Sequence, residues 1–439
     1  MPSPAPVPEL VPVSEPTPGR AEALRQALAL ALGAAVALGL ARFSYALLLG
    51  PMRADLGWSY FTAGLMNTCN AAGYLLGALL MPRAIRRFGP RTVAISGGLA
   101  TAGLLMLHAG VASDALLALL RLGAGVASAA TFVAGGLLAA RLGSRAAPGL
   151  SAGLVLGLYY GGTGLGIVVS ALLVPALDGF GAGRVGASLP AWLSGWLPVW
   201  LPAGLPAGLP IWRPTWQPAW LALGLVALGM TLLLAAGTPP DAPVNAARIE
   251  RPLTVPWRRL GPALAGYFMF GLGYIGYMTF IVSLLREQQL APALITLFYV
   301  TLGLGVVASS WLWAGLLQRC RGGGAMALLN ALLALATLLP VLSAHTVLVF
   351  VSGALFGAVF LSVVASTTAL VRHNLPVSAW AGGITGFTIV FALGQIAGPS
   401  LVGRIADGAG GLARGLAVSA AMLALGAVLA AGQRPLDRG

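Results

Sequence analysis

Long apolar segments alternate with short polar ones along almost the whole chain. A helix that crosses a bilayer needs about 20 predominantly apolar residues. Segments of this kind predict twelve transmembrane helices, at 25–49, 60–81, 92–111, 115–140, 149–174, 218–236, 260–285, 294–317, 325–342, 346–371, 378–402 and 412–431.

The composition supports a membrane protein and excludes a soluble one. Apolar residues make up 58% of the chain and charged residues only 8%, whereas a soluble domain carries about a quarter charged residues. A water-exposed protein of this composition would present large apolar patches and aggregate. We therefore expect the lipid bilayer to be an obligatory partner.

The net charge of +14 comes entirely from arginine, since the chain contains no lysine. The arginines stand in small groups between apolar segments and do not form the single basic face of a nucleic-acid-binding protein, so no nucleic acid partner is expected. Arginine-rich loops lie preferentially on the cytoplasmic side. This bias predicts a multi-pass protein of the bacterial inner membrane with both termini in the cytoplasm.

The segments divide into two groups of six. We expect a disordered cytoplasmic tail at 1–24, an N-terminal six-helix bundle at 25–236, a cytoplasmic linker at 237–259, a C-terminal six-helix bundle at 260–431 and a short tail at 432–439. An array of four-residue units with proline and tryptophan occupies 189–220. It is interpreted as a neutral expansion of an outer loop, with a ligand-capturing lid as the alternative.

Weak internal symmetry supports a duplicated six-helix unit. A short basic turn follows the second predicted helix and another follows the eighth, and glycines recur every fourth residue in the fifth and eleventh. Such glycine stripes allow close helix packing. The turn residues are Arg86, Arg87 and Gly89, then Arg319 and Gly322; the packing glycines are Gly153, Gly157 and Gly161, then Gly386, Gly394 and Gly398.

These features resemble the major facilitator superfamily over nearly the whole chain, apart from the tail and the proline–tryptophan array. The basic turns are similar to its loop signature, although Arg86 and Arg319 stand where that signature has an acidic residue, which puts the usual inner latch in doubt. Arg121 with Gly125 resembles the fourth-helix arginine signature. Segments 41–80, 271–287 and 394–403 resemble the bacterial YbfB/YjiJ-like branch.

The resemblance implies an all-α polytopic fold of two pseudo-symmetric six-helix bundles that transports a solute by alternating access. It gives little information about the substrate. The fifth predicted helix lacks the Gly-Pro kink of the drug-antiporter signature, which weakens an efflux interpretation.

Two arginines, Arg42 and Arg121, fall inside predicted spans. Charge inside hydrocarbon is costly, so an intramembrane arginine marks a functional site by default. Both lie at similar depth, and two guanidiniums can share one anion through bidentate contacts. They predict an anionic or zwitterionic substrate; the alternative for Arg121 is a structural role, bonded to neighbouring carbonyls.

A polar stripe on the second predicted helix is the next candidate. Asn67, Asn70 and Tyr74 follow the i, i+3, i+7 spacing of one helix face. They are expected to contact either the substrate or a neighbouring helix. Weaker candidates of the same kind are Tyr159, Tyr160, Tyr274, Tyr277 and Gln395.

No catalytic centre or cofactor site is expected. Cys69 and Cys320 lie far apart with no metal-ligand spacing, the acidic residues fall at helix ends, in loops or in tails, and there is no nucleotide-binding loop. Proton coupling would have to use Asp55, Asp114 or a histidine. The three histidines, His108, His345 and His373, are expected to be solvated.

The sequence thus predicts a monomeric secondary active transporter of a small organic solute, and not an enzyme. One alternative is efflux of lipophilic drugs or metabolites by the same fold. Another, from a different class, is a membrane sensor or scaffold that does not transport.

Overall fold

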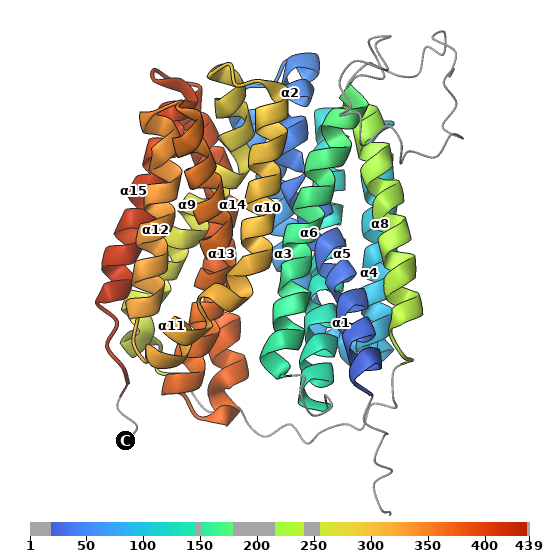
Figure 1. Cartoon of the computed structure of the whole chain (residues 1–439), viewed down its shortest axis with the longest axis vertical. Coiled ribbons are helices and arrows are strands. Elements are labelled where there is room, and N and C mark those ends of the chain that lie inside the picture. The colour runs from blue at the N-terminus through green and yellow to red at the C-terminus, as the bar shows by residue number, and fades with distance from the viewer. Residues whose placement is uncertain (1–18, 146–150, 179–215, 241–254, 437–439) are drawn as a thin grey trace, which may run out of the picture.

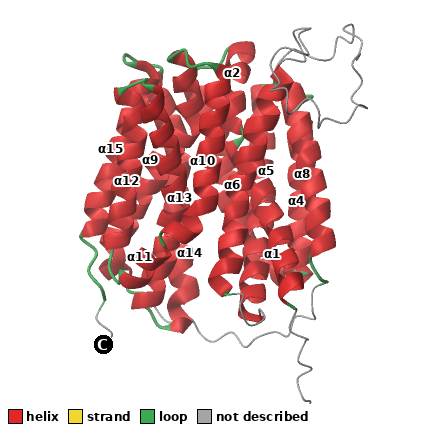
Figure 2. Cartoon of the chain, in the orientation of Figure 1, coloured by secondary structure: helices red, strands yellow, loops and turns green. Residues whose placement is uncertain are grey.

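The computed structural model describes residues 19–145, 151–178, 216–240 and 255–436. These residues form helices joined by short loops, with no strand among them (Figure 2). The first 18 residues, most of the proline–tryptophan array and the centre of the linker lie outside the described residues, so the expectations for those segments remain predictions.

The N-terminal half contains the first six spans. Its elements are α1 (Arg20–Ala34), the π-helix η1 (Ala35–Phe43), α2 (Tyr45–Leu56), α3 (Tyr60–Phe88), α4 (Pro90–His108), α5 (Asp114–Arg145), α6 (Ala152–Asp178) and α8 (Gln217–Gly237).

The C-terminal half contains the other six. Its elements are the short 3₁₀ turns η2 (Trp257–Leu260) and η3 (Val377–Ala379), and the helices α9 (Gly261–Glu287), α10 (Pro292–Leu312), α11 (Ala314–Arg319), α12 (Gly324–Leu342), α13 (Thr346–Asn374), α14 (Trp380–Ala406) and α15 (Gly411–Ala431).

The predicted twelve-span architecture is confirmed. Among the described residues, 11 helical segments are long and apolar enough to cross a membrane. The twelfth is α3, whose 29 residues are long enough, but whose asparagines, threonines and arginines lower its hydropathy. The least apolar span therefore carries the polar stripe expected from the sequence.

The two halves stand side by side in Figure 1, and α1 begins at the same end of the bundle at which α15 ends. We call this end, which carries both termini of the described chain, the proximal end, and the opposite end, where α2 finishes, the distal end. A shared end for the two termini agrees with an even number of spans.

Two boundaries differ from the predictions in an informative way. The first span begins at Arg20 rather than 25 and changes from α-helix to π-helix at Ala35. The eighth span was predicted as one helix but breaks at Trp313, between α10 and α11. The indole N–H of Trp313 donates to the Ala358 carbonyl at 2.8 Å, a contact between separate helices that periodicity does not encode.

Equivalent glycines pack in the same way in the two halves, but the predicted stripe of the fifth span is not the one that faces the first span of its own half. Gly153 has only Ser151 near its Cβ position, and Gly157 and Gly161 face α10 of the other half. The glycines equivalent to Gly394 and Gly398 are Gly162 and Gly166. In each half, two glycines on the fifth span approach two backbone carbonyls on the first span, and both pairs are spaced by four residues. In the N-terminal half Gly162 and Gly166 face Ala31 and Ala35. In the C-terminal half Gly394 and Gly398 face Phe268 and Leu272.

Candidate functional site

The π-helix of the first span frees backbone carbonyls in the middle of the bundle. Widened turns leave carbonyls without their usual helical partners, and such turns recur at functional sites. The hydroxyl of Ser44 donates to the Leu40 carbonyl at 2.5 Å. The Ala41 carbonyl accepts instead from Arg121 Nη1 of α5 at 2.9 Å, so a side chain from another span stabilises the irregular segment.

Arg42 is a buried cation whose contacts are all neutral. It is 3% exposed, and its Nη2 donates to Gln395 Oε1 at 2.9 Å. Its guanidinium lies 5.7 Å from the centre of the Tyr74 ring, and Nε has no hydrogen-bond partner. A buried charge is normally paired with an opposite one, and the described residues place no carboxylate on this one.

Gln395 connects Arg42 to an aromatic cluster on the C-terminal half. The side chain is 2% exposed, and its Nε2 donates to the hydroxyl of Tyr274. The Tyr274 ring stacks on Phe270 at 4.8 Å and on Phe391 at 5.6 Å between centroids. These stacked rings hold Tyr274, which in turn fixes the Gln395 amide with its oxygen towards Arg42.

Arg121 lies near Arg42 and makes more contacts with the protein, although its Nε also has no hydrogen-bond partner. It is 1% exposed; besides the Ala41 carbonyl, its Nη2 binds Asn67 Oδ1 at 3.2 Å. Its guanidinium lies 4.6 Å from the Tyr45 ring centroid and 5.8 Å from that of Trp220. The structure therefore brings the two arginines together as expected, and the contacts of Arg121 match the structural alternative.

The polar stripe of α3 divides between the two arginines. Asn67 accepts from Arg121 and donates through Nδ2 to Thr279 Oγ1 of α9 at 2.7 Å, so it joins the two halves. Asn70 is buried; its Nδ2 donates to the Arg121 carbonyl at 3.1 Å, and its Oδ1 has no partner. Tyr74 lies against Arg42.

The remaining tyrosine candidates lie in other contacts. The Tyr159 hydroxyl donates to the Phe132 carbonyl at 2.5 Å, and Tyr160 is exposed. Tyr277 bonds Ser352 at 2.7 Å, inside the C-terminal half. None of these contacts reaches Arg42 or Gln395.

The turn residues lie at the proximal end. Arg86 and Arg87 are exposed at the end of α3, and Arg319 is exposed at the end of α11. Gly89 ends α3 with φ 83°, a left-handed conformation that favours glycine. Gly322 differs, because it packs towards the Gln433 carbonyl.

A contact between the halves at the distal end was not foreseen from the sequence. Residues 60–68 of α3 meet residues 396–407, which form the end of α14 and its C-cap Asp407, and we call this the distal contact. The Asp407 carboxylate accepts from the backbone N–H groups of Tyr60 and Phe61 at 2.7 and 2.9 Å, and the Tyr60 hydroxyl bonds Glu287. The distal contact thus includes an acidic cap on the helix N-terminus of the opposite half.

The same contact continues towards the middle of the bundle. The Thr68 hydroxyl donates to the Ile396 carbonyl at 2.7 Å and lies 2.8 Å from Ser400 Oγ. Gly64 lies so close to the Pro399 carbonyl that a larger residue would clash. Asp55 and Asp114, the carboxylates expected from the sequence, instead accept from the indoles of Trp216 and Trp58 within the N-terminal half, at 2.9 and 2.7 Å.

The expectation of a solvated His108 is wrong. The side chain is 0% exposed, its ring stacks on Trp220 at 4.5 Å, and Nδ1 lies 2.7 Å from the Leu104 carbonyl. Trp220 belongs to a different span, 112 residues further along the chain. His345 is exposed as expected, whereas His373 is half-buried with Nδ1 3.1 Å from the Cys320 carbonyl.

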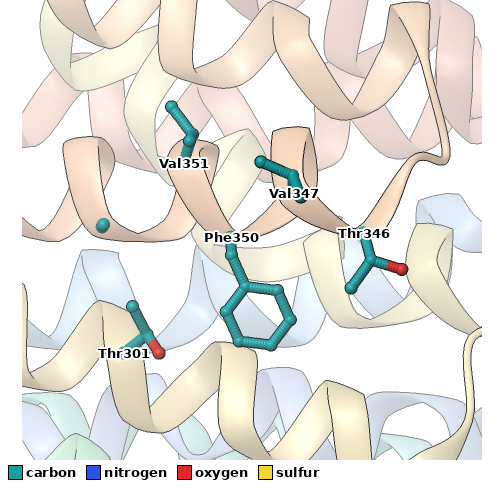
Figure 3. Close-up of a pocket in the computed structure, with 6 residues that line it drawn as sticks. Thr301, Thr346, Val347, Phe350 and Val351 are labelled. Carbon is teal, nitrogen blue, oxygen red and sulfur yellow. The ribbon is translucent and has the colours of Figure 1, made fainter.

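The groove in Figure 3 is not the polar site. It has a volume of about 400 Å³ and lies between α10 and α13. Its walls carry no charged side chain. The lining residues are Thr301, Thr346, Val347, Phe350, Val351 and Ala354.

Loss of the Asp407 cap is expected to open the distal end. In Asp407→Ala the two α3 N–H groups lose their acceptor, and a helix cap contributes about 1 kcal/mol. We call molecules in which the two halves touch at the distal contact distal-closed and molecules in which they are apart distal-open. The ratio of distal-closed to distal-open molecules should therefore fall about fivefold. Spin labels at Ala112 and Ala409, in a background with both cysteines replaced by serine, would report this change as a longer distance distribution. The matched control is Asp55→Ala, which loses a contact within one half; equal changes in both variants would contradict this role of Asp407.

The arrangement defines a class of protein: a polytopic membrane transporter with two six-helix halves and a buried polar site between them. A family model described as "Uncharacterised MFS-type transporter YbfB" matches residues 34–431. The chain therefore belongs to this YbfB-like family of the major facilitator superfamily. No curated protein matches it in sequence.

Solved structures share the fold. A bacterial homologue of the human lysosomal transporter Spinster, in an inward-facing and unoccupied conformation, is 16% identical over 94% of this chain and 96% of its own, with a TM-score of 0.66. The nucleoside transporter NupG is 12% identical over 93% of this chain and 97% of its own, with a TM-score of 0.63. The fold and membrane transport predicted from the sequence are thus confirmed.

Proposed function

We propose that this transporter carries small organic solutes with a carboxylate group, anionic or zwitterionic, and that the carboxylate binds Arg42. The observation that carries the proposal is a buried guanidinium whose one hydrogen bond among the described residues goes to a neutral amide and whose Nε has no partner. A carboxylate offers two acceptor oxygens in the geometry of the guanidinium fork. Binding an anion would remove the cost of an uncompensated charge inside the bundle.

The surrounding residues take separate roles in this proposal. Gln395, Tyr274, Tyr74 and Asn70 border the bound group, and Asn70 Oδ1 is a free acceptor suited to the ammonium group of a zwitterion. Arg121 positions the π-helix from which Arg42 projects.

The proposed transport cycle is alternating access. The two halves rock around the Arg42 site, and the distal contact is the gate on one side. From the arginine-rich loops at the proximal end we place that end in the cytoplasm of a bacterium, with the transporter in the inner membrane. We propose a monomer as the working unit.

Carboxylates are expected to stabilise the purified protein against heat, whereas their neutral amides are not. A ligand that binds only the folded state stabilises it by about 2.7 kcal/mol at a hundredfold excess over its dissociation constant. The test compares acetate, succinate and benzoate with acetamide, succinamide and benzamide in a thermal unfolding assay in detergent. Stabilisation by lipophilic cations alone would contradict the proposal and favour drug efflux.

A further inference from the structure

We infer that Gln395 is an internal ligand of Arg42: its amide oxygen occupies the anion position in the empty transporter, and the substrate carboxylate must displace it. This inference rests on the proposed function. It adds a residue that competes with the substrate, and it connects substrate binding to the contact between the two halves.

The competition follows from the chemistry of the two acceptors. Gln395 Oε1 is the only hydrogen-bond acceptor for the Arg42 guanidinium among the residues that the structure describes. An amide oxygen carries only a partial charge and binds one N–H group here, whereas a carboxylate carries a full charge and can bind the guanidinium in a bidentate way. The amide oxygen therefore accepts the Arg42 hydrogen bond in the empty state. A substrate carboxylate that reaches the same guanidinium binds it more strongly and displaces the amide.

The amide is held in place from its own half. Its Nε2 donates to Tyr274, whose ring also faces Phe360 at 5.9 Å. The neighbouring Gly394 and Gly398 bring α14 into direct contact with the α9 backbone. Gln395 is therefore fixed to the C-terminal half, and Arg42 belongs to the N-terminal half.

The Arg42–Gln395 bond lies at the inner end of the distal contact. Successive turns of α14 meet successive turns of α3: Gly403 lies at Tyr60, Pro399 lies at Gly64, and Ile396 binds Thr68. Gln395 precedes Ile396 and extends this series to Arg42. A carboxylate that takes the place of Gln395 thus removes one of the side-chain links between the two halves.

The consequence is a coupling between loading and gating. A ligand shifts a conformational equilibrium by its differential affinity for the two states. In the distal-closed state Gln395 is bonded to Arg42 and competes with the substrate carboxylate. In a state in which α14 has moved away, Arg42 has lost this bond and can bind the carboxylate. Substrate therefore favours distal opening, and the empty protein favours distal closure.

Gln395→Glu is expected to place a tethered carboxylate on Arg42, which blocks the anion position and strengthens the link between the two halves. The tethered carboxylate pairs with Arg42, so the ligand-free variant should unfold at a higher temperature than the wild type and show a larger distal-closed population between labels at Ala112 and Ala409. Its apparent affinity for acetate, succinate and benzoate should fall at least tenfold. Gln395→Met removes the competitor, and should bind the same carboxylates several-fold more tightly and open the distal end without ligand.

The control is Gln288→Glu, because Gln288 lies at the distal end of the same half and bonds the Pro340 carbonyl, away from Arg42. It should bind carboxylates as the wild type does. Wild-type carboxylate affinity in both Gln395 variants would overturn this inference and leave the proposed function intact. If no carboxylate stabilises the wild type, the proposed function itself fails, and the competition fails with it.

Discussion

Arg42→Gln is expected to weaken carboxylate binding at least a hundredfold. Arg42 is a buried cation without an anionic partner among the described residues, so its replacement removes the charge that the proposed substrate neutralises. Losing a charge-assisted, desolvated pair costs about 2–5 kcal/mol, and a hundredfold change in affinity is about 2.7 kcal/mol. The measurement is the carboxylate concentration that gives half-maximal thermal stabilisation of each protein.

The ligand-free Arg42→Gln protein should remain folded, because glutamine keeps a hydrogen bond to Gln395 within reach and removes an uncompensated charge. The matched control is Arg404→Gln, an exposed arginine on α14, which should retain wild-type affinity. Equal affinities in wild type and Arg42→Gln would exclude Arg42 as the anion site.

Arg121→Met is expected to destabilise the protein by about 3 kcal/mol, since hydrogen bonds to charged groups contribute about 1.5–3 kcal/mol each and orphaned partners add a desolvation cost. The substitution leaves the Ala41 carbonyl and Asn67 Oδ1 without their donor and removes contacts with two aromatic rings. The unfolding temperature in detergent, compared with that of the exposed control Arg83→Met, gives the measurement.

The same variant distinguishes the two roles proposed for Arg121. A positioning residue, once replaced, lowers stability while the folded fraction still binds carboxylate. A protein of unchanged stability that no longer binds carboxylate would instead make Arg121 the ligand and would contradict its role in positioning the π-helix.

Much of the fold was predictable, because crossing a bilayer imposes a length and a composition on every span. Arg42 and Arg121 were identifiable for a related reason: charge is rare in hydrocarbon and therefore conspicuous in the sequence. The 3.6-residue period placed Asn67, Asn70 and Tyr74 on one face.

What the sequence did not contain was the pairing between distant residues. Gln395 and Arg42 are separated by 353 positions, so a polar side chain in an apolar span made Gln395 a candidate without revealing its partner. Asp407 was missed because an acidic residue at a helix end is usually solvated, and the sequence does not show that the N-terminus of α3 lies opposite it. His108 was misjudged because the ring that covers it belongs to another span.

The π-helix could not be predicted from the sequence for another reason. The segment Ala35–Phe43 contains no proline and reads as a continuous apolar helix. Its widened turns depend on the partners of its free carbonyls, Arg121 from α5 and Tyr299 from α10; Tyr299 donates to the Phe43 carbonyl at 2.7 Å. Thr279, which bonds Asn67, was likewise visible only as one more hydroxyl in an apolar span.

The most direct test of carboxylate transport through the Arg42 site is uptake into proteoliposomes of the carboxylate that binds best, with its neutral amide as the paired solute. We expect saturable uptake of the carboxylate by the wild type, none of the amide, and loss of uptake in Arg42→Gln but not in Arg404→Gln. Equal uptake of carboxylate and amide, or full uptake by Arg42→Gln, would contradict an anion site at Arg42.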